Sequence, residues 1–206
     1  MSWENYIPEE LANLYEIHDF KHAAAILSKE FPQEFSEICS ALIQFRFSRQ
    51  DLLKAGGNES HIPKMFSEIL RPMGWHEKNL SAELNVYEIK GKKSKELKRS
   101  ISHGSHKVDY LKGRVAFDLE WNSKDQTFDR DLYAFRAFFD YDSISVGVLV
   151  TRSNELDPLF KQLKINGKYG ASTTHLGKLI HRLDAGRNGG CPVLVFGITT
   201  KLIVDL

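Results

Sequence analysis

Two short segments in the second half of the chain are almost continuously apolar, and they limit the possible folds more than any other feature. Residues 143–151 and 192–199 are rich in Val, Ile, Leu and Phe. Unbroken apolar strands are typical of a sheet that is covered on both faces. Residues 128–139 and 173–183 have the spacing of amphipathic helices. Buried strands that alternate with helices predict an α/β fold with a central mixed sheet flanked by helices.

The first half of the chain is predicted to be mainly helical. We expect a strand at 14–20 and helices at 20–29, from Pro32 through Leu42, and from Pro63 to near Pro72. A break is expected at Gly56-Gly57-Asn58. Residues 90–106 are rich in Lys, Ser and Gly, which indicates a mobile basic loop or a frayed helix.

Length and composition indicate an ordinary globular protein. The 206 residues fit one domain spanning residues 1–206, and 42% hydrophobic with 27% charged residues argues against a disordered chain or a coiled coil. No apolar stretch approaches the roughly 18 residues of a membrane span, and the N-terminus lacks the features of a signal peptide, so we expect a cytoplasmic protein. Cys39 and Cys191 are too few for a disulfide framework, and we expect both to be buried and reduced.

The charges are distributed unevenly although the net charge is only +1. Residues 89–114 contain nine basic and two acidic side chains, and residues 161–201 contain seven basic side chains and one acidic. Two separate basic segments suggest a surface for a polyanion such as nucleic acid. The alternative is a solvated loop and a solvated helix face, and a charge run alone favours that alternative.

A predicted pair of strands in the middle of the chain carries the most informative residues. We expect strands at 107–111 and 114–121, joined by a turn at Lys112-Gly113. A two-residue turn at that point would pair Leu111 with Arg114. The second strand alternates, so that every other side chain lies on one face.

Three acidic side chains are expected to converge on that face. Asp118 and Glu120 would lie about 7 Å apart at their α-carbons. Asp109 would lie diagonal to Asp118 on the neighbouring strand, within reach of it. Like charges this close raise each other's pKa unless a cation neutralises them, and hard oxygen ligands suit Mg²⁺. A carboxylate-bound Mg²⁺ beside a basic surface suits phosphodiester hydrolysis, whereas the alternative is a solvated acidic strand face.

The spacing of Asp109, nine residues before Asp118-x-Glu120, resembles the core of the PD-(D/E)xK nucleases. The chain more specifically resembles the BglII/BstYI family of type II restriction endonucleases. Segments that match this family in the expected order are 19–27, 35–42, 66–75, 118–121, 128, 146–148 and 186–198, with an apparent gap over 79–103.

The resemblance implies a Mg²⁺-dependent, homodimeric endonuclease that cuts a short palindromic site in double-stranded DNA. Asp109 and Asp118 would be the Mg²⁺ ligands. Glu120 stands where the wider fold usually has Lys and this family usually has Gln, so it would be a second metal ligand, a base that orients water, or both. All three residues are candidate catalytic residues.

Two polar loops resemble the family's DNA-recognition loops. Residues 122–127 directly follow the catalytic strand, and residues 166–175 form the second loop. The candidate DNA-binding residues are Asn122, Ser123, Lys124, Lys168, Ser172, Thr173 and Thr174. Lys can bond guanine acceptors in the major groove, and Asn can read adenine. The alternative for both loops is an ordinary polar turn.

Two other functions stay open from the sequence. A DNA-binding protein of the same fold could have lost cleavage and kept the carboxylates as relics. A structure-specific repair nuclease could use the same chemistry without two symmetric recognition loops.

Overall fold

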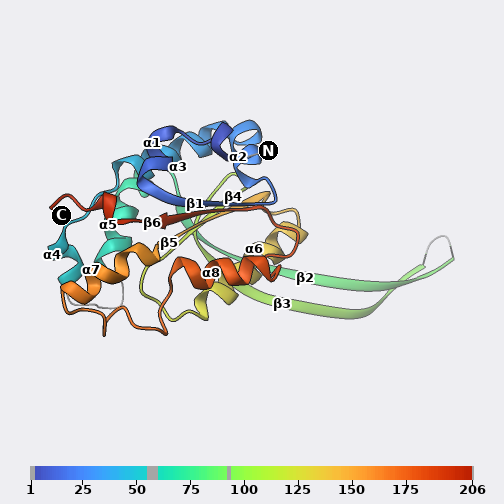
Figure 1. The fold of residues 1–206 in the computed structure, drawn as a ribbon. Coiled ribbons are helices and arrows are strands. Elements are labelled where there is room, and N and C mark those ends of the chain that lie inside the picture. Colours follow the sequence, from blue (N-terminus) through green and yellow to red (C-terminus); the bar gives the residue numbers. More distant parts are fainter. Residues whose placement is uncertain (1–2, 55–59, 92–93, 206) are drawn as a thin grey trace.

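The computed structural model describes residues 3–54, 60–91 and 94–205, and its centre is a six-stranded mixed sheet (Figure 1). The predicted break at 56–58 therefore lies outside the described residues. The strands are β1 (Tyr15–Phe20), β2 (His76–Lys90), β3 (Ser94–Lys112), β4 (Val115–Glu120), β5 (Val146–Arg152) and β6 (Val193–Ile198). Their order is β1-β6-β5-β4-β3-β2. Strands β4, β5 and β6 are parallel, while β1, β3 and β2 are each antiparallel to their neighbours.

Helices cover both faces of the parallel part of the sheet (Figure 1). The helices are α1 (Glu9–Leu14), α2 (Ala23–Glu30), α3 (Pro32–Gln44), α4 (Arg49–Leu53), α5 (His61–Leu70), α6 (Thr127–Asp140), α7 (Asp157–Gln162) and α8 (Leu176–Asp184). Short 3-10 turns are η1 (Trp3–Asn5), η2 (Arg71–Met73), η3 (Asn154–Leu156) and η4 (Thr200–Leu202). Helices α1–α3 and α5 pack on one face, and α6 and α8 pack on the other. Among the described residues, no helix is both long and apolar enough to span a membrane.

The buried strands confirm the predicted α/β class. Every residue of β5 and of β6 is buried, as their unbroken apolar sequences indicated. Helix α6 packs so closely on the sheet that a Cβ atom at Gly147 of β5 would lie 2.3 Å from the ring of Phe135. The predicted helix at 128–139 is confirmed as α6, and the predicted strand at 14–20 is β1. Both cysteines are buried and free.

The prediction of a basic loop at 90–106 is wrong, because these residues continue two long strands. Strands β2 and β3 pair from His76 to Lys90, whereas β4 pairs with β3 only at residues 110–112. The remaining hairpin, residues 79–91 and 94–107, projects from the body of the protein, and we call it the arm (Figure 1). Lys92 and Lys93 lie outside the described residues. The composition resembled that of a loop because most of the arm is exposed, while its base packs on α6 through Leu80, His103 and His106.

The predicted turn at Lys112-Gly113 is displaced by one residue. Lys112 pairs with Val115, so Gly113 and Arg114 form the turn. Gly113 has φ +54°, a left-handed conformation that favours glycine. Lys112 stays in the strand, where its ammonium donates to both carboxylate oxygens of Glu37 at 2.6 and 2.7 Å. The predicted strand pairing is thus wrong by two residues, which leaves the assignment of side chains to faces unchanged.

Candidate active site at the end of strand β4

Strand β4 places Asp118 and Glu120 on one face, as the alternation predicted. Ala116 on that face packs in the core cluster that contains α6, while Phe117 on the other face packs with α5. Asp118 and Glu120 are only 2% and 6% exposed. The alternative of a solvated acidic strand face is therefore wrong for these two residues, because α6 covers the sheet at this point.

Asp109 contacts Asp118 in a different way from the predicted diagonal. The ladder between β3 and β4 ends at Tyr110 and Phe117. The next backbone group, the N–H of Asp109, donates to Oδ1 of Asp118 at 2.6 Å. Oδ1 of Asp118 thus takes the place of a backbone carbonyl in the strand pairing. This hydrogen bond holds the carboxylate beside Asp109. The other oxygen of Asp118, Oδ2, is buried and has no hydrogen-bond partner among the described residues.

Helix α6 adds a fourth carboxylate and a cation that the sequence analysis did not identify. Asp131 is 2% exposed and lies close enough for its charge to raise the pKa of both Asp118 and Glu120. Arg130 contacts Asp131 at 3.0 Å and approaches Glu120 at 3.7 Å. Asp131 lies three residues after Phe128 and four residues before Phe135, which places it on the apolar face of α6. A charged residue in that position is the sequence signal that could have identified it.

Burial and mutual repulsion raise the pKa of every member of this carboxylate cluster, Asp109, Asp118, Glu120 and Asp131. Burial is the largest cause for each. The pKa of Asp118 is well above its ordinary value, with the charges of Asp131 and Asp109 adding to burial. The pKa of Glu120 rises to about 8 and that of Asp131 to about 6. The positive charge of Arg130 opposes the rise at Glu120, Asp131 and Asp109.

The donor set fits a hard divalent cation. Asp118 has a buried oxygen without a partner, and Asp109 lies beside it. A cation near these oxygens would satisfy the orphan acceptor and reduce the repulsion that raises their pKa. Among the described residues, no three His, Cys, Asp or Glu side chains are placed closely enough to enclose a metal by themselves. Mg²⁺ does not need such an enclosure, because it is usually held by one or two carboxylates and keeps several waters.

A cleft of about 570 Å³ opens beside the cluster, between α5, the base of the arm and the end of β4. Asp109 and Glu120 line it, while Asp118 is buried behind them. Arg71 and Lys107 bring positive charge to the same cleft. Glu77 also lines the cleft and is paired with Lys107. The cleft therefore gives a substrate access to two carboxylates, with Arg71 on its wall.

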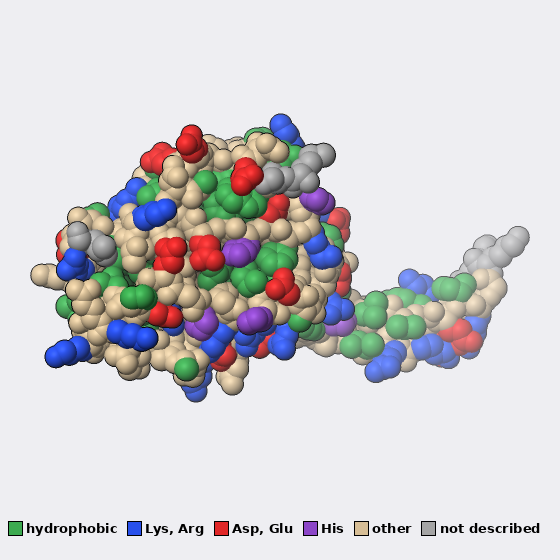
Figure 2. Space-filling model, viewed as in Figure 1, with side chains coloured by type: hydrophobic (Ala, Val, Ile, Leu, Met, Phe, Trp, Pro, Cys, Tyr) green, Lys and Arg blue, Asp and Glu red, His purple; other side chains and the backbone are tan. Residues whose placement is uncertain are grey.

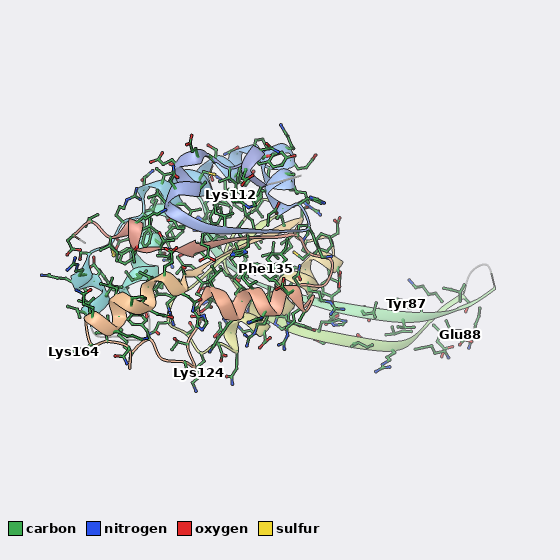
Figure 3. All side chains as sticks on the ribbon, viewed as in Figure 1. Tyr87, Glu88, Lys112, Lys124, Phe135 and Lys164 are labelled. Carbon is green, nitrogen blue, oxygen red and sulfur yellow. The ribbon has the colours of Figure 1, made fainter. Side chains whose placement is uncertain are left out.

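The two predicted recognition loops lie side by side. Lys124 and Thr173 form a backbone bridge, the N–H of Asp125 donates to Ser172 at 3.0 Å, and that of Thr174 donates to Ser123 at 2.9 Å. The loops thus form one surface directly after β4. Lys124 is exposed and lies on the same side of the sheet as α8 (Figure 3).

The other candidate DNA-binding residues differ in their accessibility. Ser172 is exposed, and Asn122 is half-buried with a buried side-chain oxygen that lacks a partner among the described residues. Thr174 is buried, and the hydroxyl of Thr173 accepts from Arg152 at 3.1 Å. The ammonium of Lys168 donates to the carbonyls of residues 52 and 54 at 3.1 and 2.6 Å, so it ties its loop to α4.

Comparison with known families matches residues 15–198 to the model described as Restriction endonuclease BglII/BglIII. The match covers nearly the whole chain and includes the carboxylate cluster and both loops. No curated protein matches the chain.

Proposed function

Because the chain belongs to the restriction endonuclease BglII/BglIII family, we propose that it cuts both strands of a short palindromic DNA site as a Mg²⁺-dependent homodimer. Family membership confirms the resemblance found in the sequence and makes the chain a type II site-specific deoxyribonuclease that acts on double-stranded DNA. Enzymes of this kind are generally metal-dependent. The choice of Mg²⁺, the palindrome and the dimer are the proposed parts.

The buried oxygen of Asp118 without a hydrogen-bond partner is the observation that carries the Mg²⁺ proposal. Asp118 and Asp109 would hold the ion. When bound, Mg²⁺ supplies Lewis-acid chemistry, which lowers the pKa of water and stabilises charge on a phosphate. Asp109 keeps the carboxylate of Asp118 in place through its backbone N–H.

Glu120 is the proposed residue that orients the attacking water and moves its proton. Glu120 lines the cleft, whereas Asp118 does not. A pKa of about 8 in the metal-free protein lets Glu120 exchange a proton near neutral pH. A hydrogen bond with Ser123 opposes this rise and limits it. Ser123 thus links the proposed base to the loop that we assign to DNA binding.

The joined surface of residues 122–126 and 172–174 is the proposed DNA-recognition surface. It starts at the end of the catalytic strand, so DNA that contacts it also reaches the cleft. Exposed Lys124 and Ser172 are its proposed direct contacts. Asn122, Ser123, Lys168, Thr173 and Thr174 complete the proposed set. The hydrogen bonds of Lys168 to α4 and the burial of Thr174 suit a role in shaping the loops.

A homodimer follows from a palindromic site, because each subunit would meet the same half-site and cut one strand. The first test is digestion of plasmid DNA with Mg²⁺ or EDTA, with the fragment ends mapped by sequencing. We expect discrete fragments that map to one palindrome with Mg²⁺ and none with EDTA. Fragments that map to DNA structures rather than to a sequence would support a repair nuclease instead. Sedimentation that shows a monomer both free and on the cognate duplex would exclude the dimer.

Substitution of Lys124 separates base reading from phosphate binding. A groove-inserted Lys that reads guanine contributes about 1–3 kcal/mol of discrimination. We therefore expect Lys124→Ala to reduce cognate affinity about tenfold or more, with a much smaller loss on scrambled duplex. Competition binding at one salt concentration measures both, with exposed Lys164→Ala as the control. Equal losses on both duplexes would show that Lys124 only contacts phosphate.

A further inference from the structure

Arg130 stands at the open edge of the carboxylate cluster. It lies in the first turn of α6, and its side chain is 64% exposed although it touches two buried carboxylates. Its Nε and Nη2 atoms donate to Oδ1 of Asp131 at 3.2 and 3.0 Å, and Nη2 lies 3.7 Å from Glu120. The guanidinium of Arg130 therefore contacts Asp131 and Glu120 while it is also exposed to solvent.

A cation on the protein, in addition to a bound metal ion, would favour the approach of a phosphate to the cluster. Asp109, Asp118, Glu120 and Asp131 would repel a phosphodiester, and no residue of β4 is basic. Within the described parts of the chain, Arg130 is the one cationic side chain with a nitrogen within 4.0 Å of any of these carboxylates. Arg71 and Lys107 line the cleft, but neither is paired with these carboxylates, and the ammonium of Lys107 is paired with Glu77.

The free side of the guanidinium has the geometry to bind a phosphate. The Nη1 atom makes no hydrogen bond to a described residue, while Nε and Nη2 are held by Asp131. Arginine binds phosphate oxygens through a planar fork of donors, and its charge persists at all working pH values. We propose that Arg130 is a catalytic residue that contacts the scissile phosphate, and that Asp131 is the positioning residue that aims it.

This inference rests on the proposed function, because it needs a phosphodiester at the carboxylate cluster. In the transition state the phosphate gains negative charge, which a donor fixed in advance stabilises more than it stabilises the ground state. Asp131 can fix that donor because its carboxyl is buried beneath α6 and accepts two hydrogen bonds from Arg130. The pair would thus supply the positive charge that β4 lacks.

Single-turnover cleavage of the mapped cognate duplex tests the role of Arg130. We expect Arg130→Gln to lower the rate about 10²–10³-fold, the usual cost of removing one such donor, and Arg130→Lys to lower it less. Arg136→Gln is the matched control, because Arg136 is a similarly exposed arginine on the same helix that pairs with Asp140. The control should cut at the wild-type rate, and circular dichroism should show that all variants are folded.

Binding without metal provides a readout that does not depend on cleavage. Wild type and Arg130→Gln are compared in EDTA on two duplexes, one normal and one with an uncharged methylphosphonate at the scissile position. We expect Arg130→Gln to weaken binding to the normal duplex about tenfold, as loss of a charge-assisted contact does, and to leave binding to the methylphosphonate duplex unchanged. Equal losses on both duplexes would overturn the contact with the scissile phosphate.

The positioning role of Asp131 is tested by non-additivity. Asp131→Asn should lower kcat with little change in KM, and the double variant with Arg130→Gln should be no slower than Arg130→Gln alone. Rate losses that multiply in the double variant would overturn the positioning role. If wild type cuts DNA and Arg130→Gln cuts equally fast, Arg130 has no catalytic role. If wild type itself does not cut, the proposed function fails instead.

Discussion

The same sheet is buried at one end and almost fully exposed at the other. Glu120 at the end of β4 has a side chain that is 7% exposed, and burial raises its pKa to about 8. Glu96 in the arm is 48% exposed, and hydrogen bonds from Lys90 and Lys98 lower its pKa. The same type of side chain on the same sheet thus titrates in opposite directions, because one is enclosed by α6 and the other meets water and lysines.

The arm and the core also differ in what stabilises them. Large apolar side chains of the arm are 40–66% exposed, and Figure 2 shows them among charged groups on the projecting hairpin; they are Leu84, Val86, Tyr87, Ile89 and Leu97. Two strands without a covered face are marginally stable in water, and exposed ion pairs add little. The packing energy at the covered end of the sheet can therefore offset the cost of burying several carboxylates. The arm has no comparable packing energy.

Removal of a core ring should have the largest effect on stability. Phe117 is fully buried and stacks on Phe66 with ring centroids 5.4 Å apart. We expect Phe117→Ala to reduce the free energy of unfolding by about 3–5 kcal/mol. Tyr87→Ala in the arm is the matched substitution and should cost less than about 0.5 kcal/mol. Urea denaturation measures both, and equal costs would show that the arm is as tightly packed as the core.

A pH effect of intermediate size should come from Glu120. Its carboxyl binds a proton more tightly in the folded chain, with pKa about 8, than in the unfolded chain, where it is near 4.5. The free energy of unfolding should therefore decrease between about pH 5 and pH 8 in EDTA. The raised pKa of Asp109, Asp118 and Asp131 acts in the same direction. The lowered pKa of His175 opposes it within this range, and the lowered pKa of Glu37 and Asp51 opposes it only at lower pH.

Glu120→Gln should flatten this slope, whereas Glu96→Gln in the arm should leave it unchanged. Thermal midpoints of the metal-free proteins across this pH range provide the measurement. A wild-type midpoint that stays constant or rises from pH 5 to pH 8 would contradict the assigned burial of Glu120.

Shortening of the arm should have the smallest effect. Ser81 and Ser105 are paired across the hairpin, so an Asn-Gly turn can join them directly in place of residues 82–104. The deletion removes mainly exposed side chains, and we expect the thermal midpoint to change by less than about 4 °C. A large decrease would show that the arm stabilises the body of the protein.

The sequence predicted those parts of the molecule whose residues follow a local period. Strands β5 and β6 and helix α6 were identified from apolar spacing, and the period of two placed Asp118 and Glu120 together. The pairing of β3 with β4 differs from the predicted pairing by two residues. A shift of two keeps every side chain on the same face of the sheet, so Asp118 and Glu120 still lie together.

The features that were missed depend on packing between distant segments. Asp131 and Arg130 reach the cluster because the connection from β4 to β5 folds α6 back over the sheet, which no local pattern specifies. Residues 90–106 were taken for a loop because their few apolar residues do not alternate. The partner strand does alternate, at Leu80, Ala82, Leu84 and Val86, and the sequence analysis did not use that signal.

Cleavage of the mapped cognate duplex by wild type, Asp118→Asn and Glu88→Gln, each in Mg²⁺ and in EDTA, tests the central claim most directly. A metal site is worth several kcal/mol in the transition state, which corresponds to about 10³-fold in rate. We expect Asp118→Asn to lose at least this much while it binds DNA as well as or better than wild type, because one negative charge is removed. Glu88→Gln changes a carboxylate of the arm and should cut like wild type in Mg²⁺. Cleavage by Asp118→Asn at the wild-type rate in saturating Mg²⁺ would contradict the assignment of the active site to the buried end of the sheet.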